Sequence, residues 1–223
     1  MTFKELLQKY RKIAFSQRDK GARFERLMQS YLLTDPTYAA DLSKVWLWEE
    51  FPYREELGGT DTGIDLVALT HDDQYWAIQC KCYQEQVVIQ KAEVDTFIST
   101  SGRSFDDEEG SELNFAHRLW IETTGNGWSK HAEEAIKNQN PEFSRISLGA
   151  LKEAPVDWAL LEEGIHGEQA RREKKELRKH QTKALNKTLE HFQSADRGKL
   201  IMACGTGKTF TALRIAEGVT DSK

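Results

Sequence analysis

The stretch GIDLVALTHDDQYWAIQCKCY, residues 63–83, has the alternating pattern of a β-hairpin, with THDDQ as its turn. Because side chains alternate along a strand, a turn centred near Asp72 places Asp65 opposite or diagonal to Gln79. Lys81 then lies one pleat further along, on the same face. We therefore expect a carboxylate, an amide and an ammonium group to converge. The other face is apolar and can pack in a core: Leu66, Ala68, Trp76, Ile78 and Cys80.

The polar face of this hairpin allows two interpretations. Burying an unpaired carboxylate or ammonium group costs several kcal/mol, so such groups need partners or a metal ion. On the hairpin pattern alone, Asp65 and Lys81 could form an ordinary salt bridge on a solvated sheet face. The same residues could instead form a functional site, and the surrounding sequence favours this second interpretation.

Helical and strand patterns surround the hairpin in an alternating order. Upstream, residues 3–15 and 19–33 have helical spacing, and residues 44–52 have the pattern of a strand. Downstream we expect a helix, a strand, a helix capped by Ser129 and a further strand, over residues 89–100, 116–125, 129–139 and 143–154. The order α-α-β-β-β-α-β-α-β predicts an α/β fold with one mixed sheet flanked by helices, ending near residue 160.

The spacing Asp-x13-Gln-x-Lys on two adjacent strands resembles the PD-(D/E)xK nuclease superfamily. It is most similar to the Mrr-like branch, in which Gln replaces the acid of the second strand. Upstream, KGARFERL (20–27) resembles the Gly-x-x-Phe-Glu of that branch's first helix, and LWIETTGNGWSKHAEEAI (119–136) resembles its later strand, loop and helix. The resemblance covers roughly residues 20–150. The sequence departs from the superfamily pattern in lacking Pro before Asp65.

This resemblance implies a restriction-endonuclease-like fold and a Mg²⁺-dependent phosphodiester hydrolase. Asp65 would supply a carboxylate oxygen to the metal, Gln79 an amide oxygen and Cys80 its backbone carbonyl, all hard oxygen ligands of the kind that Mg²⁺ prefers. Lys81 would hold and help deprotonate the attacking water, and would then offset negative charge in the transition state.

Two further acids are candidates for the same site. Glu25 could complete it from the helix of residues 19–33, because Glu25 follows Phe24 on the expected buried stripe; it could equally be an ordinary exposed glutamate. Asp61 is a weaker candidate and more typical of a turn residue. The substitution of Gln79 for an acid removes one negative charge, so the site is expected to bind Mg²⁺ weakly.

A second motif follows a change in composition after the nuclease-like region. Residues 161–178 are strongly charged, which indicates a linker or an exposed helix. From 179 to 223 we expect a helix over 180–193, a short strand KLIM over 199–202, the glycine loop ACGTGKT over 203–209 and a closing helix. MACGTGKT resembles motif I of superfamily 2 helicases and translocases, although Met202 replaces the first Gly of the general phosphate-loop pattern.

This second resemblance implies an ATP site at the start of a RecA-like ATPase domain. The backbone N–H groups of Gly205, Thr206, Gly207 and Lys208 would cradle a phosphate. Lys208 would reach the β- and γ-phosphates, Thr209 would hold Mg²⁺, and Gln181 would contact adenine. Neither the acid pair that completes such a site nor a second RecA-like lobe follows within these residues, so the chain resembles the first part of a longer protein.

The overall charge gives little guidance, but its distribution is uneven. The formal net charge is −5, whereas residues 1–26 hold eight Lys and Arg against three acids, and residues 171–187 hold eight against two. Basic segments are typical either of solvated faces or of contacts with a phosphate backbone. Three cysteines form no disulfide framework. With no signal peptide and no apolar run near about 18 residues, we expect a cytoplasmic bacterial protein.

The order of the two motifs has a functional implication. An Mrr-like nuclease followed directly by a superfamily 2 motor is similar to the single-polypeptide type ISP restriction-modification enzymes. That resemblance implies an ATP-dependent endonuclease acting on double-stranded DNA, with motor, methyltransferase and target recognition in the remainder of the polypeptide. The alternatives are a nuclease for modified DNA, a repair nuclease-helicase, or a catalytically inactive DNA-binding domain coupled to a motor.

Overall fold

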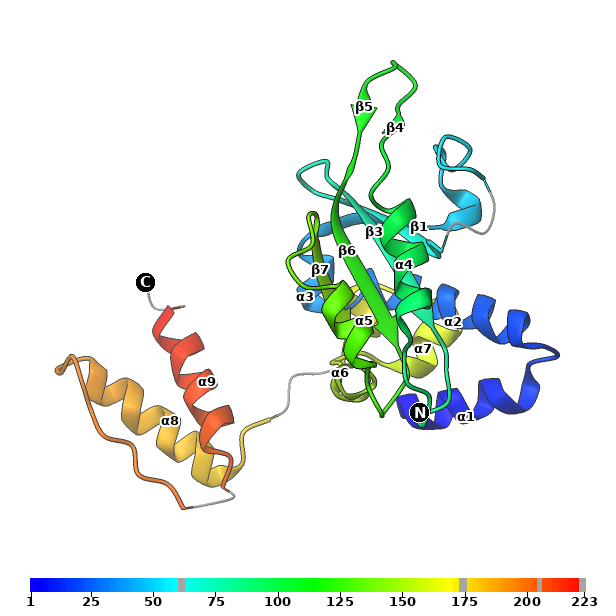
Figure 1. Cartoon of the computed structure of the whole chain (residues 1–223). Coiled ribbons are helices and arrows are strands. Elements are labelled where there is room, and N and C mark those ends of the chain that lie inside the picture. The colour runs from blue at the N-terminus through cyan, green and yellow to red at the C-terminus, as the bar shows by residue number, and fades with distance from the viewer. Residues whose placement is uncertain (60–62, 173–175, 204–205, 221–223) are drawn as a thin grey trace. The chain divides into compact units, whose positions relative to one another are not determined.

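The computed structural model describes residues 1–59, 63–172, 176–203 and 206–220. The chain divides into two compact units, Met1–Arg172 and Glu173–Lys223. Figure 1 shows the helices and strands of each unit.

The first unit is built on a mixed five-stranded sheet, which confirms the predicted α/β class. Its strand order is β1-β2-β3-β6-β7, with β1, β2 and β3 antiparallel and β3, β6 and β7 parallel. The strands are β1 (Leu42–Leu47), β2 (Leu66–Thr70), β3 (Tyr75–Lys81), β6 (Phe115–Glu122) and β7 (Glu142–Ile146).

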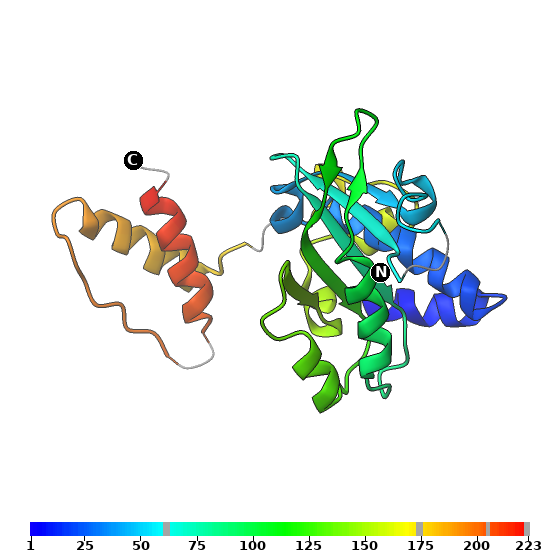
Figure 2. The same cartoon turned by 45° about the horizontal axis from the view of Figure 1, so that its top comes forward.

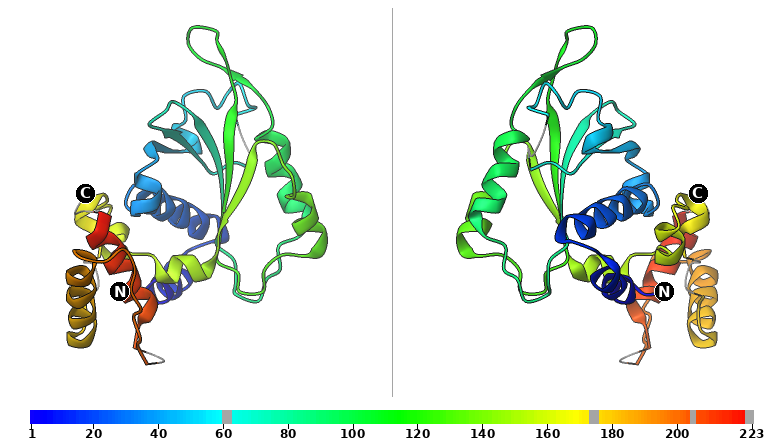
Figure 3. Two further views of the ribbon diagram at one scale, coloured as in Figure 1. Left: turned by 90° about the vertical axis from the view of Figure 1, so that its left-hand side faces the viewer. Right: turned by 90° about the vertical axis from the view of Figure 1, so that its right-hand side faces the viewer.

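Helices cover both faces of this sheet, so the unit has two hydrophobic cores (Figure 3). The first core packs between the sheet and α1 (Phe3–Ile13), α2 (Gln17–Leu32), α6 (Leu148–Glu153) and α7 (Trp158–Glu162). The second core packs against α4 (Lys91–Thr100) and α5 (Lys130–Ala135). The α2 stripe of Phe24, Leu27, Met28, Tyr31 and Leu32 is buried in the first core as its helical spacing predicts.

The hairpin of β2 and β3 has the register expected from a turn near Asp72. Leu66 pairs with Ile78 and Val67 with Ala77, and the Asp65 N–H donates to the Ile78 carbonyl at 2.9 Å. Asp65 therefore lies opposite Gln79, as predicted. The face they share is also buried further along the strands, where Val67 and Ala77 enter the second core. The polar cluster thus lies at the end of an apolar sheet face.

Several shorter elements were not expected from the sequence. We predicted a strand throughout residues 143–154. These residues instead form most of β7 and then α6, because the Ser147 side chain accepts a hydrogen bond from the Ala150 N–H and caps the helix. Pro36 begins a short helix, and a two-stranded hairpin extends beyond the sheet (Figure 2). The added elements are α3 (Pro36–Ala39), the 3₁₀ turn η1 (Trp48–Glu50), β4 (Phe105–Asp106) and β5 (Glu112–Leu113). The cap at Ser129 is confirmed.

The first unit continues beyond the predicted boundary at residue 160. The Gly167 N–H donates to Thr34 Oγ1 at 2.9 Å, and Arg171 Nε donates to the Thr34 carbonyl at 2.8 Å. Ala170, at the end of the turn η2 (Glu168–Ala170), is fully buried. Residues 161–172 therefore pack on the nuclease-like unit, and we place the boundary after Arg172 rather than in a linker starting at 161.

The second unit contains the two predicted helices, α8 (Lys179–Phe192) and α9 (Lys208–Thr220). The predicted KLIM strand is wrong: residues 199–202 are irregular, and the side chain of Ile201 is 80% exposed. A strand needs a neighbour for its backbone hydrogen bonds, and no strand occurs among the described residues of this unit. Across the parts of the chain that the structure describes, none of the helices is both long and apolar enough to cross a membrane.

Candidate active site

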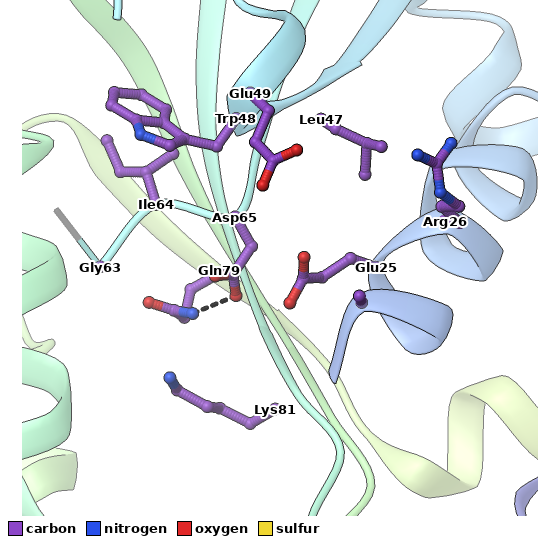
Figure 4. Close-up of a pocket in the computed structure, with 11 residues that line it drawn as sticks. Glu25, Arg26, Leu47, Trp48, Glu49, Gly63, Ile64, Asp65, Gln79 and Lys81 are labelled. Carbon is purple, nitrogen blue, oxygen red and sulfur yellow. Dashed lines mark hydrogen bonds between the residues drawn. The ribbon is translucent and has the colours of Figure 1, made fainter. Parts of the chain in front are cut away.

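A pocket of about 240 Å³ opens where the N-terminal end of β2 meets α2. Four segments contribute to it: the middle of α2, the end of β1 with η1, the chain entering β2, and the C-terminal end of β3 (Figure 4). Its lining residues are Ala22, Glu25, Arg26, Leu47, Trp48, Glu49, Gly63, Ile64, Asp65, Gln79 and Lys81. The structure therefore brings Asp65, Gln79, Lys81 and Glu25 together.

Asp65 is held by two donors from the neighbouring strand. Gln79 Nε2 and the backbone N–H of Cys80 both donate to Asp65 Oδ2, the second at 2.7 Å. Gln79 is almost fully buried, whereas Asp65 is half-buried. Together these contacts fix the orientation of the carboxylate at the pocket wall, and Figure 4 shows the bond from Gln79.

Lys81 brings the ammonium group into the same pocket from β3. Lys81 and Gln79 are two residues apart, so both side chains lie on one face of the strand. Lys81 Nζ lies 6.0 Å from the centre of the Trp120 ring, on the adjacent strand β6. The Lys81 side chain lines the pocket, on the same side as Gln79 (Figure 4).

Glu25 enters the pocket from α2, at the edge of that helix's buried stripe. Burial raises the pKa of Glu25 to about 7, with a further increase from the nearby Asp65 charge and a partial decrease from Lys81. The carboxyl groups of Glu25 and Asp65 therefore repel each other across the pocket. A cation between them would relieve this repulsion.

Glu49 is a pocket residue that the sequence analysis missed. It lies in η1 directly after β1, and its carboxylate points into the pocket toward Glu25 (Figure 4). Its charge also contributes to the raised pKa of Glu25. The only sequence signal is the acidic pair Glu49–Glu50 after a predicted strand, and that signal does not indicate which side chain faces the pocket.

The donor set of the pocket fits a hard cation. Asp65 and Glu25 offer carboxylates. Gln79 offers an amide oxygen, and rotation of the amide group would exchange the positions of this oxygen and Nε2. Burial raises the pKa of the Cys80 thiol, which therefore stays protonated, so only its backbone carbonyl is a suitable ligand. Among the described residues, however, no three His, Cys, Asp or Glu side chains lie close enough together to form a metal site by themselves.

The glycine loop of the second unit is partly described. Gly207 has φ +79°, and α9 begins at Lys208, so the loop leads into a helix N-terminus as expected for a phosphate-binding loop. Gln181 is buried, and its Nε2 donates to the Thr206 carbonyl at 3.0 Å. Thr209 lies in the first turn of α9. Asp61 and Gly205 lie outside the described residues.

A mixed sheet between two helical layers, with Asp65 opposite Gln79 and Lys81 on one strand face, defines a restriction-endonuclease-like protein. Residues 33–168, more than half of the chain, match the family described as restriction endonuclease, of Mrr-like type. The chain therefore belongs to the Mrr-like restriction endonuclease family. Residues 174–223 match the family described as type III restriction enzyme, res subunit.

Solved structures give a consistent comparison. The chain is similar to the ATP-dependent type ISP restriction-modification enzyme LlaBIII bound to DNA, with 31% identity, a TM-score of 0.71 and full coverage of this chain. The chain spans 13% of the length of that enzyme. No match was found among curated proteins.

Two further restriction endonucleases are less similar to this chain. The MspJI endonuclease in complex with a 27-mer oligonucleotide has 14% identity over 66% of this chain and 30% of its own. The DNA modification-dependent endonuclease AspBHI has 16% identity over 72% of this chain and 34% of its own. Both have a TM-score of 0.37, which is too low to support an argument about this chain.

Proposed function

We propose that residues 1–172 form a Mg²⁺-dependent DNA endonuclease, the N-terminal part of an ATP-dependent, translocating restriction-modification enzyme that acts on double-stranded DNA. The observation that carries this proposal is the convergence of Asp65, Gln79 and Lys81 in one pocket, with Glu25 on the opposite wall. The 31% identity with the type ISP enzyme over the whole chain supports the wider assignment.

The residues of the pocket would have different roles in phosphodiester hydrolysis. Asp65, Gln79 and the Cys80 carbonyl would hold Mg²⁺, which when bound polarises the phosphate and makes water a stronger nucleophile. The Gln79 and Cys80 hydrogen bonds keep the Asp65 carboxylate oriented before DNA arrives. Lys81 orients the attacking water and offsets the charge that develops on the phosphate oxygens.

The second unit would bind ATP with Mg²⁺ in the longer enzyme. Its loop presents Thr206, Gly207, Lys208 and Thr209 at the start of α9, and Gln181 contacts the loop from α8. In this proposal Gly205 and Lys208 bind phosphate, and Gln181 recognises adenine. The same polypeptide would supply the remaining motor, the methyltransferase and target recognition.

Nicking of supercoiled plasmid by the purified chain with Mg²⁺ tests the nuclease assignment. We expect Asp65→Ala and Lys81→Ala each to lower the nicking rate at least about a hundredfold, the usual effect of removing one transition-state contact. Circular dichroism would show that both variants remain folded.

Two matched controls come from the same sheet. Asp72→Ala changes an exposed acid in the turn of the same hairpin, and Lys44→Ala removes a lysine whose Nζ lies 4.6 Å from the centre of the Trp46 ring. Both should nick DNA normally. Normal nicking by folded Asp65→Ala or Lys81→Ala protein would refute the proposed site.

A further inference from the structure

The turn between α1 and α2 presents an aromatic side chain to solvent. Phe15 is 96% exposed, although phenylalanine is usually among the most buried residues. The turn projects from the side of the first unit in both Figure 1 and Figure 2. A single exposed apolar side chain is common on protein surfaces, but this ring stands fully open to solvent at a projecting turn and is therefore available to a ligand.

This turn is held in one conformation by reciprocal hydrogen bonds. Ser16 caps α2, and its Oγ accepts from the Asp19 N–H at 3.0 Å. Asp19 Oδ2 in turn accepts from the Phe15 N–H at 3.1 Å. The backbone on both sides of Phe15 is thereby fixed, so a contact made by its ring would order little additional chain.

Exposed cationic residues flank Phe15 along the chain. Lys12 and Arg18 are exposed on either side of Phe15. The nearest acid, Asp19, already pairs with Arg23 through a 3.1 Å contact. An exposed aromatic ring flanked by exposed cations is suited to bind a polyanion that also has flat apolar surfaces. Nucleic acid has both properties, in its phosphates and its bases.

The cationic surface continues toward the active pocket. Arg11 Nη2 donates to the Tyr83 carbonyl at 3.3 Å, two residues beyond Lys81. Lys20 lies in α2, between Phe15 and Glu25 along the chain, while Arg11 reaches the segment that follows β3. A strand of DNA with a phosphate in the pocket would therefore pass these cations on its way to the turn.

The length of α2 sets the distance between the turn and the pocket. Phe15 and Glu25 are ten positions apart along the chain, mostly within α2, which corresponds to roughly 15 Å at a helical rise of about 1.5 Å per residue. DNA rises about 3.4 Å per base pair, so this span covers about four base steps.

From these observations we propose that the α1–α2 turn is a second DNA contact. Lys12, Arg18 and Lys20 bind backbone phosphates, and the Phe15 ring inserts as a wedge against a partly unstacked base of the duplex, about four steps from the phosphate that is cut. This inference rests on the proposed nuclease function and adds a surface for the DNA that flanks the cleavage point.

Binding measurements in the Asp65→Ala background separate this contact from cleavage. The probe is a short duplex in which 2-aminopurine replaces one base, placed in turn at successive positions. We expect Phe15→Ala to weaken binding about tenfold, as the loss of one base stack predicts, and to abolish the 2-aminopurine fluorescence change. Phe15→Tyr should retain both, because its ring also stacks. Ile13→Ala, at a neighbouring exposed apolar residue, should behave as the parent.

Two results would overturn the proposal, and both differ from failure of the nuclease assignment. One is unchanged affinity in Phe15→Ala, and the other is a fluorescence change that persists without the ring. Failure of the nuclease assignment would instead appear as wild-type protein that does not nick plasmid in an Asp65-dependent way. The binding assay reports on Phe15 in either case.

Discussion

Gln79 is the residue that most distinguishes this pocket from a site with two strand carboxylates. Its amide hydrogen-bonds Asp65 and carries no charge, so the strand pair alone offers a cation only one carboxylate. Glu25 brings a second carboxylate from α2 into the same pocket. We infer that Glu25 recovers part of the charge that Gln79 lacks.

This inference predicts opposite outcomes for two conservative changes. Glu25→Gln should raise the Mg²⁺ concentration for half-maximal nicking by about tenfold, because an amide oxygen is a weaker ligand than a carboxylate. Gln79→Glu should retain cleavage and lower that concentration. Mg²⁺ titrations of plasmid nicking measure both, and a Mg²⁺ requirement unaffected by Glu25→Gln would leave Glu25 without a role at the cation.

The raised pKa of Glu25 also predicts that stability depends on pH in metal-free solution. Burial and the Asp65 charge raise the pKa of Glu25 to about 7, above its value in the unfolded chain. Between about pH 4.5 and 7 the folded state therefore binds more protons than the unfolded state, so the contribution of this group to stability falls as pH rises.

Glu25→Gln removes this pH-dependent term. We expect the variant to be more stable than the wild type by about 1–2 kcal/mol at pH 8, a value reduced for the solvent that reaches this half-buried carboxyl. The difference should vanish near pH 4.5. Urea unfolding in EDTA at several pH values measures it, and parallel curves for the two proteins would contradict a raised pKa.

At the scale of elements, the chain entering β2 is positioned by α4. Gly63 has φ +73°, a conformation that glycine adopts without strain, and a Cβ there would lie 3.3 Å from the Phe97 backbone nitrogen in α4. Gly63 lines the pocket two residues before Asp65. The close approach of this segment to α4 therefore helps to set where the Asp65 carboxylate lies.

Gly63→Ala should lower both stability and nicking. Backbone strain and the contact with α4 together predict a loss of about 2 kcal/mol in the free energy of unfolding. Gly110→Ala is a matched control, because Gly110 has φ +79° but open space around its Cβ position, so it tests strain alone. Equal stability losses and normal nicking in both variants would show that α4 does not position the site.

For the molecule as a whole, the described residues of the second unit include most of the proposed phosphate loop but no sheet of the kind that normally supports one. The described residues of this unit form α8 and α9, and Leu200 and Ile201 are 43% and 80% exposed. In RecA-like domains the loop follows a strand of a sheet, and an acidic residue from another segment helps the loop Ser or Thr to hold Mg²⁺. The described residues of this unit include no strand beside the loop.

We therefore expect no ATP hydrolysis by this chain, with or without DNA. A phosphate-release assay tests this, and Lys208→Ala is the control for contaminating ATPases, because it removes the lysine that would contact the β- and γ-phosphates. DNA-stimulated ATP turnover that disappears in Lys208→Ala would contradict the expectation.

Local sequence patterns were enough to predict the order of the main elements, the register of the β2–β3 hairpin and the identity of its polar residues. These features depend on local periodicity and turn position, which neighbouring residues set. Motif spacing likewise located the glycine loop and its two flanking helices.

Contacts between distant segments set which groups join the pocket and which segments belong to each unit. Glu49 faces Glu25 because η1 turns the chain at the end of β1, and residues 161–172 pack on the first unit through contacts with Thr34. The KLIM segment has strand-forming residues but no partner strand among the described residues, so it stays irregular. In each case the outcome depends on contacts between residues far apart in the chain, which local pattern does not encode.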